Sequence, residues 1–187
     1  MTLLVLGLVL WTAAHLFKRV APAARAGLAT GVGDGPAKGV IALVILAGVV
    51  LMVIGYRAAP VTPVYAPPAW GIHVNNLAMF AAVLLMGAGQ SKSHARAWLR
   101  NPMLTGVAVW ALAHLLVNGD VASLVLFGWL GLWAVGSIAL IDAQEPGWIR
   151  LEPGTTAGDI RLVVIAAVIY AVIAAIHAWL GYWPFPQ

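Results

Sequence analysis

The sequence predicts an all-α integral membrane protein, a bundle of six transmembrane helices with the N and C termini outside. Of its 187 residues, 63% are hydrophobic and only 9% are charged. A soluble domain of this length could not cover so much apolar surface with so few charges. Six apolar stretches approach the roughly 17–25 residues that cross a hydrocarbon core of ~30 Å. The basic residues gather in alternate connections between these stretches.

The six stretches follow one another along the chain, separated by polar or proline- and glycine-rich connections. The first has no positive residue before it, whereas Lys18 and Arg19 follow it, which is the reverse of a cleavable signal peptide. We therefore expect it to remain as the first span. The predicted spans cover residues 3–17, 40–56, 70–87, 102–117, 121–141 and 160–182.

The distribution of lysine and arginine predicts the orientation of the bundle. Nine of the ten lie in the first, third and fifth connections, and only Arg57 lies on the other side. Cytoplasmic loops carry such an excess, so we expect these three connections in the cytoplasm. The basic residues flank the apolar stretches, where they would face lipid headgroups, and this accounts for the net charge of +4. We therefore predict no binding to nucleic acid.

The connections differ in composition. Residues 31–36 lack the strand and the Gly-Lys-Ser/Thr ending of a phosphate-binding loop, so we expect a flexible linker there. Four prolines within residues 60–68 predict an extended strap. The short, basic segment 90–100 predicts a turn of helix at the membrane interface. Rings at the outer boundaries are expected to anchor in headgroups; they are Tyr65, Trp70, Trp179, Tyr182 and Trp183.

The acidic residues and the absence of cysteine exclude several kinds of site. All six Asp and Glu lie in loops or at helix starts, where Asp120 and Asp159 have the position of N-caps. No carboxylate pair and no Ser-His-Asp arrangement can be drawn, which argues against a hydrolase or an ion-coupled transporter. A chain without cysteine has no disulfide, iron–sulfur cluster, thiolate zinc site or covalently attached c-type haem.

The histidines are the residues that point to a chemical function. His114 belongs to an otherwise apolar helix that starts with Asn101 as N-cap and Pro102 at the first helical position. An imidazole inside hydrocarbon is expected only where it has a partner. Four of the five histidines fall in predicted spans, namely His15, His73, His114 and His177.

Two of these histidines share a local pattern. Trp11 precedes His15, and Trp110 precedes His114, in the form W-x-x-A-H-L, which puts each tryptophan one turn before its histidine on the same helix face. An aromatic ring, small alanines and an imidazole suit a flat macrocycle whose iron binds the histidine. Histidines that only make structural hydrogen bonds between helices are the alternative interpretation.

The helix around His114 carries a more specific resemblance. Residues 100–106 (RNPMLTG) and 110–120 (WALAHLLVNGD) resemble the signature of the NnrU family of bacterial integral membrane proteins. The early His15 and the segment Trp70-Gly71-Ile72-His73 are similar to that family too. The resemblance therefore implies a single NnrU-type transmembrane domain over residues 1–187, a multi-pass protein of the bacterial inner (cytoplasmic) membrane.

The resemblance also implies a chemistry. The family is linked to nitrite and nitric oxide metabolism in denitrifying bacteria, and it is similar to 15-cis-zeta-carotene isomerase, a membrane enzyme that uses haem b. By this resemblance His15 and His114 are the iron ligands, and Ala111 stands where the isomerase has a cysteine that exchanges with a ligand in a redox switch. The chain departs from the isomerase at that position. It also departs from the family pattern Arg-His-Pro, because Asn101 stands in place of the histidine.

The residues leave the second iron ligand open. Counting 1.5 Å per residue puts His15 toward the cytoplasm and His114 toward the outside, an offset on the order of 10 Å. His73 and His177 lie nearer the depth of His114, so His73 is the second choice, whereas His177 is assigned to the interface. The other residues predicted to line a haem, orient a histidine or hold propionates are Trp11, Trp110, Ala111, Asn76, Asn118 and Arg100.

The leading prediction is a haem b-binding protein of the NnrU family. It would act as a redox-linked, isomerase-like enzyme or oxidoreductase on a lipophilic small molecule, or in nitric oxide or nitrite metabolism. Its partners would be membrane lipids and haem, and its oligomeric state is not predicted. One alternative is a non-catalytic membrane scaffold or assembly factor for denitrification enzymes. Another is a methyltransferase, because residues 100–106 resemble the Arg-x-Pro-x-x-x-Gly of isoprenylcysteine-type enzymes, but residues 142–146 do not supply their acidic cofactor motif.

Overall fold

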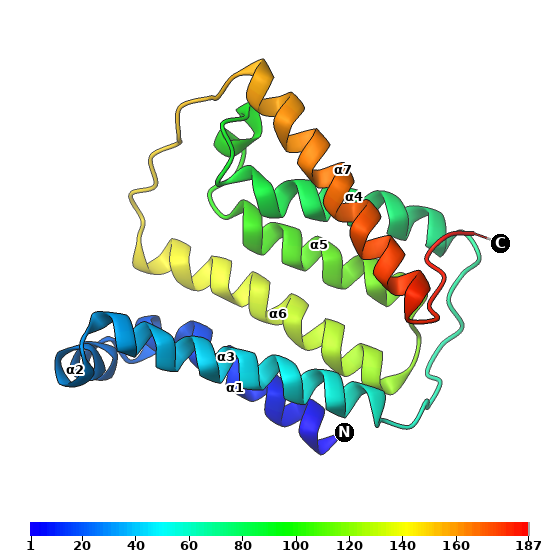
Figure 1. The fold of residues 1–187 in the computed structure, drawn as a ribbon, viewed down its shortest axis with the longest axis horizontal. Coiled ribbons are helices and arrows are strands. Elements are labelled where there is room, and N and C mark those ends of the chain that lie inside the picture. Colours follow the sequence, from blue (N-terminus) through cyan, green and yellow to red (C-terminus); the bar gives the residue numbers. More distant parts are fainter. Residues whose placement is uncertain (187) are drawn as a thin grey trace. The chain divides into compact units, whose positions relative to one another are not determined.

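The computed structural model describes residues 1–186, which form seven α-helices and one short 3-10 helix and contain no β-strand (Figure 1). The predicted all-α class is confirmed. In chain order the helices are α1 (Thr2–Val20), α2 (Pro22–Val32), α3 (Asp34–Arg57), α4 (Gly71–Ala88), η1 (His94–Ala97), α5 (Pro102–Val117), α6 (Val121–Gln144) and α7 (Thr156–Trp179).

Five of these helices, α1, α3, α4, α6 and α7, are long and apolar enough to cross a membrane. Many of their large apolar side chains are exposed, among them Leu43 at 66% and Leu132 at 76%, as surfaces that face lipid require. The chain is therefore a membrane protein. Helix α5 has 16 residues, about 24 Å of helix, which is less than the ~30 Å hydrocarbon core. Five predicted spans are thus supported by length, and the sixth span and the terminal orientation stay predictions.

The chain folds as two compact units. Unit one comprises Met1–Thr62 and Asp120–Trp129, and unit two comprises Pro63–Gly119 and the described chain from Leu130 onward. The first turns of α6 therefore belong to unit one, and the rest of α6 belongs to unit two.

In unit one, α1 and α3 pack antiparallel at a distance that only glycine allows. A Cβ atom added at Gly7 would lie 2.6 Å from the Gly48 carbonyl oxygen, and one added at Gly55 would collide with the backbone of Leu4. Small residues let membrane helices approach this closely. The same contact positions Trp11, because a Cβ atom at Gly48 would lie 3.2 Å from the Trp11 nitrogen.

The flexible linker predicted at residues 31–36 is wrong, because two helices meet there with one residue between them. Helix α2 ends at Val32 and α3 begins at Asp34. Gly33 between them has φ +89°, a conformation that glycine adopts readily and that ends α2. Asp34 then binds Lys38 at 2.6 Å and Arg25 at 3.5 Å. The alanine-rich segment 21–29 favours a helix, and the linker prediction overlooked that signal.

In unit two, α4 packs against α5 and against α7. Helices α4 and α5 lie side by side and antiparallel (Figure 1), and a Cβ atom at Gly106 would lie 2.8 Å from the Ala82 carbonyl oxygen. Between α4 and α7, the rings of Phe80 and Tyr170 meet edge to face with 6.0 Å between centroids. These contacts hold α5, the helix of His114, against a long apolar neighbour.

Hydrogen bonds at the connections test the predicted helix starts. Asp120 caps α6 as predicted, since its carboxylate accepts from the Ser123 nitrogen at 3.1 Å. The predicted cap at Asp159 is wrong, because the Thr155 hydroxyl caps α7 instead. Asp159 accepts from the backbone nitrogen and Nδ1 of His94 at 2.8 and 2.6 Å, and so ties η1 to the start of α7. The short turn of helix predicted within residues 90–100 is confirmed as η1.

Candidate functional site

Each unit contains one tryptophan–histidine pair, which we call a Trp–His module. In α1, His15 Nδ1 donates to the Trp11 carbonyl oxygen at 2.8 Å, and the ring centroids lie 4.1 Å apart at a tilt of 33°. In α5, His114 Nδ1 donates to the Trp110 carbonyl oxygen at 2.9 Å, with 5.0 Å between centroids and a tilt of 52°. The sequence repeat therefore forms two similar local structures.

The backbone hydrogen bond determines which nitrogen of each imidazole carries the proton. A carbonyl oxygen can only accept, so the neutral ring has its proton on Nδ1 and a lone pair on Nε2. His177 makes the same bond to the Ile173 carbonyl oxygen at 2.8 Å without a tryptophan one turn before it. The bond thus follows from a helical position, and the tryptophan ring beside the imidazole is what distinguishes the two modules.

The neighbours of His114 fix the helix that carries it. Asn118 Nδ2 donates to the His114 carbonyl oxygen at 2.9 Å, so this side chain supports the backbone. Ala111 is 1% exposed and packs on α6, because a Cβ atom at Gly131 would lie 3.2 Å from the Ala111 Cβ. The position where the resemblance puts a redox-switching cysteine therefore carries a buried methyl group.

The C-terminal end of α5 is closed by the strap that joins α3 to α4. The Val64 and Tyr65 nitrogens donate to the Gly119 carbonyl oxygen at 2.7 and 3.1 Å. The Tyr65 hydroxyl donates to the carbonyl oxygens of Asn118, at 3.0 Å, and of Leu115. These bonds satisfy acceptors that the end of a helix leaves open. Sequence reasoning treated Tyr65 only as an interfacial anchor and missed this role.

Three histidines of unit two differ in their relation to one another. The start of α4 packs on the end of α5, where a Cβ atom at Gly71 would lie 2.9 Å from the Leu116 carbonyl oxygen, so His73 and His114 lie at the same end of the unit. The His73 side chain is exposed, whereas His114 is half-buried. His177 belongs to α7 in the same unit.

The other two predicted site residues lie elsewhere. His15 belongs to unit one, so its pairing with His114 stays a prediction. Arg100 lies before the start of α5, and Pro102 at that start is about 18 Å from His114 along the helix axis. Its guanidinium is 3.1 Å from Asp142 and 3.5 Å from the Glu145 carboxylate, and it donates to the Glu145 carbonyl oxygen at 2.5 Å. A role of Arg100 in holding propionates stays a prediction as well.

No group of three or more His, Asp or Glu side chains within residues 1–186 could hold a metal ion by itself. The iron of a haem requires less, because the porphyrin supplies the equatorial nitrogens and the protein supplies only axial ligands. The two Trp–His modules offer imidazole donors that suit such a group.

Comparison with known families decides the classification. The family model described as NnrU protein matches residues 3–184. The chain belongs to the NnrU family. The matched region of this NnrU member includes both Trp–His modules, the strap and Arg100. No curated protein matches the chain, and no solved structure matches it.

Proposed function

We propose that this NnrU-family protein binds haem b in the bacterial cytoplasmic membrane, with His114 as an axial ligand of the iron. The observation that carries the proposal is the repeated Trp–His module, in which a backbone carbonyl holds the proton on Nδ1 and leaves the lone pair on Nε2. This neutral tautomer is the one that binds a metal through Nε2. His15 carries the second module and is the first choice for the other axial position, followed by His73.

The protein groups around His114 suit a flat apolar cofactor. Trp110 presents an aromatic face beside the imidazole. Tyr65 and Asn118 hold the end of α5, and with it the height of the imidazole, whereas the Trp110 carbonyl oxygen sets the tautomer. When bound, a haem would supply one-electron redox chemistry or a site for a small diatomic molecule. The contribution of this chain is to orient the imidazole and to keep water from it.

The proposal includes six crossings with both termini outside. Helix α5 would make the sixth crossing, although it is short, because the strap satisfies the backbone acceptors at its end. Non-helical backbone is tolerated at membrane depth only where the protein satisfies its polar groups. The cysteine-free chain permits a clean test with single cysteines. Ser91→Cys should react with an impermeant thiol reagent only from the cytoplasmic side, and Ala59→Cys only from the outside.

The proposed class of reaction rests on the family resemblance and is consistent with a site among apolar helices. A haem between apolar helices is reached by lipophilic molecules from the bilayer and by small uncharged molecules such as nitric oxide. The proposed activity is therefore redox-linked conversion of a lipophilic substrate, similar to the isomerase, or the handling of nitric oxide.

Absorption spectra of the protein purified in detergent, with and without dithionite, test the proposal. We expect a Soret band that is lost in His114→Ala and kept in His94→Ala, which removes an imidazole outside the apolar helices. His15→Ala and His73→Ala should then separate the two choices for the second ligand by a change from low-spin to high-spin iron. A colourless wild-type protein from haem-supplied cells would contradict haem binding and favour a scaffold or assembly factor for denitrification enzymes.

A further inference from the structure

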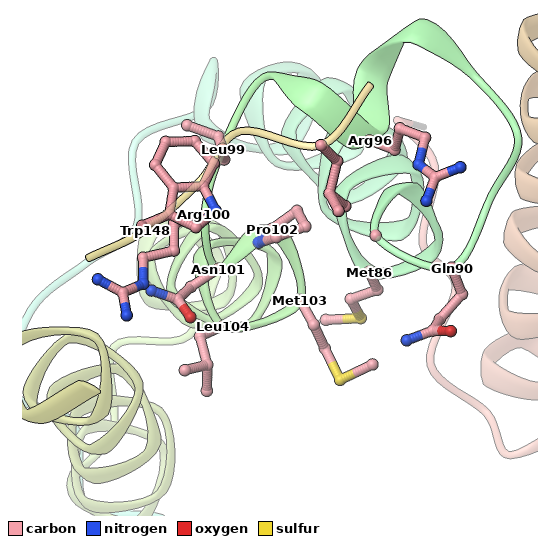
Figure 2. Close-up of a pocket in the computed structure, with 12 residues that line it drawn as sticks. Met86, Gln90, Arg96, Leu99, Arg100, Asn101, Pro102, Met103, Leu104 and Trp148 are labelled. Carbon is pink, nitrogen blue, oxygen red and sulfur yellow. The ribbon is translucent and has the colours of Figure 1, made fainter. Parts of the chain in front are cut away.

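A pocket of about 250 Å³ lies in unit two where α4 ends and α5 begins (Figure 2). Its walls come from the last turn of α4, from η1 and the residues after it, from the first turn of α5, and from the segment that follows α6. Figure 2 shows Arg96 and Gln90 on one side of this pocket, and Arg100 and Trp148 on the other. The pocket is at the opposite end of α5 from His114 and does not depend on the proposed haem site.

The two arginines in the pocket differ in how their charge is compensated. Arg100 is bound by the carboxylates of Asp142 and Glu145. Arg96 forms no ion pair within residues 1–186, and its Nε is buried without a hydrogen-bond partner among those residues. A buried donor without an acceptor is unfavourable, and more so when the group is charged. The pocket therefore contains one guanidinium whose charge and whose Nε proton call for an anionic acceptor.

The remaining walls and the size of the pocket limit what that anion can be. Met86, Leu104 and Leu151 give the pocket apolar sides. Its volume of about 250 Å³ is below the roughly 300–1,000 Å³ typical of drug-sized ligands. The pocket is too small for a porphyrin and large enough for part of a phospholipid headgroup. Helix α4 ends and helix α5 begins at this pocket. In the proposed topology this places the pocket at the level of lipid headgroups, where phosphates are abundant.

We propose that this pocket, with Arg96 as its anion-binding group, binds a phosphate group, the chemistry shared by anionic phospholipid headgroups and free inorganic phosphate. The planar guanidinium matches a phosphate through paired N–H donors. The apolar sides accept the glycerol end of a lipid while its acyl chains stay in the bilayer. Gln90, on the same side of the pocket as Arg96 (Figure 2), adds an amide that can donate to a phosphate oxygen.

Calorimetric titration of the delipidated full chain in neutral detergent tests the proposal. One arm uses dioctanoylphosphatidylglycerol, a second uses inorganic phosphate, and a third uses dioctanoylglycerol, which has the same chains without the phosphate. Arg96→Gln removes the charge at nearly constant size. Gln90→Glu keeps Arg96 and adds a negative charge to the pocket wall, which should repel a phosphate. Arg161→Gln, at an exposed arginine at the start of α7, is the matched control, and circular dichroism checks that each variant is helical.

We expect the wild type to bind the phosphate-bearing lipid or inorganic phosphate, and not dioctanoylglycerol. Arg96→Gln and Gln90→Glu should each weaken that binding about ten-fold or more, whereas Arg161→Gln should change it by less than about three-fold. Binding in the lipid arm alone identifies a membrane phospholipid, and binding of inorganic phosphate identifies a soluble source. Equal affinities in Arg96→Gln and Arg161→Gln, or no preference of the wild type for either phosphate over dioctanoylglycerol, would overturn the proposal.

Discussion

Replacing Gly7 with alanine tests whether the close contact between α1 and α3 holds unit one together. The new Cβ atom would lie 2.6 Å from the Gly48 carbonyl oxygen, whereas ordinary contact begins at 3.4 Å. The obstructing atom belongs to the backbone, so no side-chain rotation relieves the clash. The two helices must therefore separate by about 0.8 Å, and a packed interior does not absorb such a shift freely.

The expected loss follows from two opposing effects. An extra methyl group in a tightly packed contact costs about 1–3 kcal/mol. Alanine in place of glycine in a helix returns about 0.8–1 kcal/mol. Gly39→Ala provides the control, because it gains the same helix propensity in α3 and its Cβ atom would meet nothing within 4 Å. The difference in unfolding free energy between the two variants therefore isolates the packing cost of about 1–3 kcal/mol.

The assay is equilibrium unfolding in mixed micelles at increasing SDS, followed by circular dichroism and by tryptophan fluorescence. Gly7→Ala should unfold at lower SDS than the wild type or Gly39→Ala. Equal stabilities of Gly7→Ala and Gly39→Ala would refute the glycine contact as the reason that α1 and α3 lie so close.

Three further predictions concern the polar contacts. Tyr65→Phe removes a donor to the carbonyl groups at the end of α5, so we expect a loss of about 0.5–1.5 kcal/mol and faster amide exchange at residues 118–120; unchanged exchange would contradict the capping role. Burial raises the pKa of Asp120, but hydrogen bonds from Ser123 and from neighbouring backbone N–H groups together outweigh burial, and the net pKa lies below the ordinary value of 3.8. Its stabilisation is therefore present above that pH and lost as the pH falls below it, and Asp120→Ala should flatten the acid side of the stability–pH curve, whereas a parallel curve would argue against this cap. Asp159→Asn removes the carboxylate that pairs with His94, and since both side chains are well exposed it should leave global stability nearly unchanged while speeding amide exchange in η1; a large global loss would show that the contact does more than anchor η1.

Local patterns explain what the sequence could predict. The long apolar runs predict helices α1, α3, α4, α6 and α7, because length and composition alone decide whether a helix can cross a bilayer. The Trp–His modules were predictable for a similar reason. Residues four apart face each other on any helix, so Trp110 and His114 meet whatever the tertiary structure is.

Contacts between distant residues explain what the sequence could not predict. Tyr65 reaches carbonyl groups some fifty residues away, and nothing in the strap's own composition indicates that target. Asp159 has the position of a helix cap, but a competing hydroxyl at Thr155 takes that role and frees the carboxylate for His94. The compensation of Arg100 likewise depends on where the last turn of α6 and the residue after it lie.

The most direct test of iron ligation by His114 is chemical rescue. In His114→Gly the imidazole is removed and a cavity of its size is left, so the purified variant should lose most of its haem b. Adding free imidazole and haem should restore the Soret band, whereas the same additions to His94→Gly should change nothing. Haem retained at the wild-type level in His114→Gly, or a wild-type protein that binds no haem at all, would contradict the assignment of His114 as the ligand.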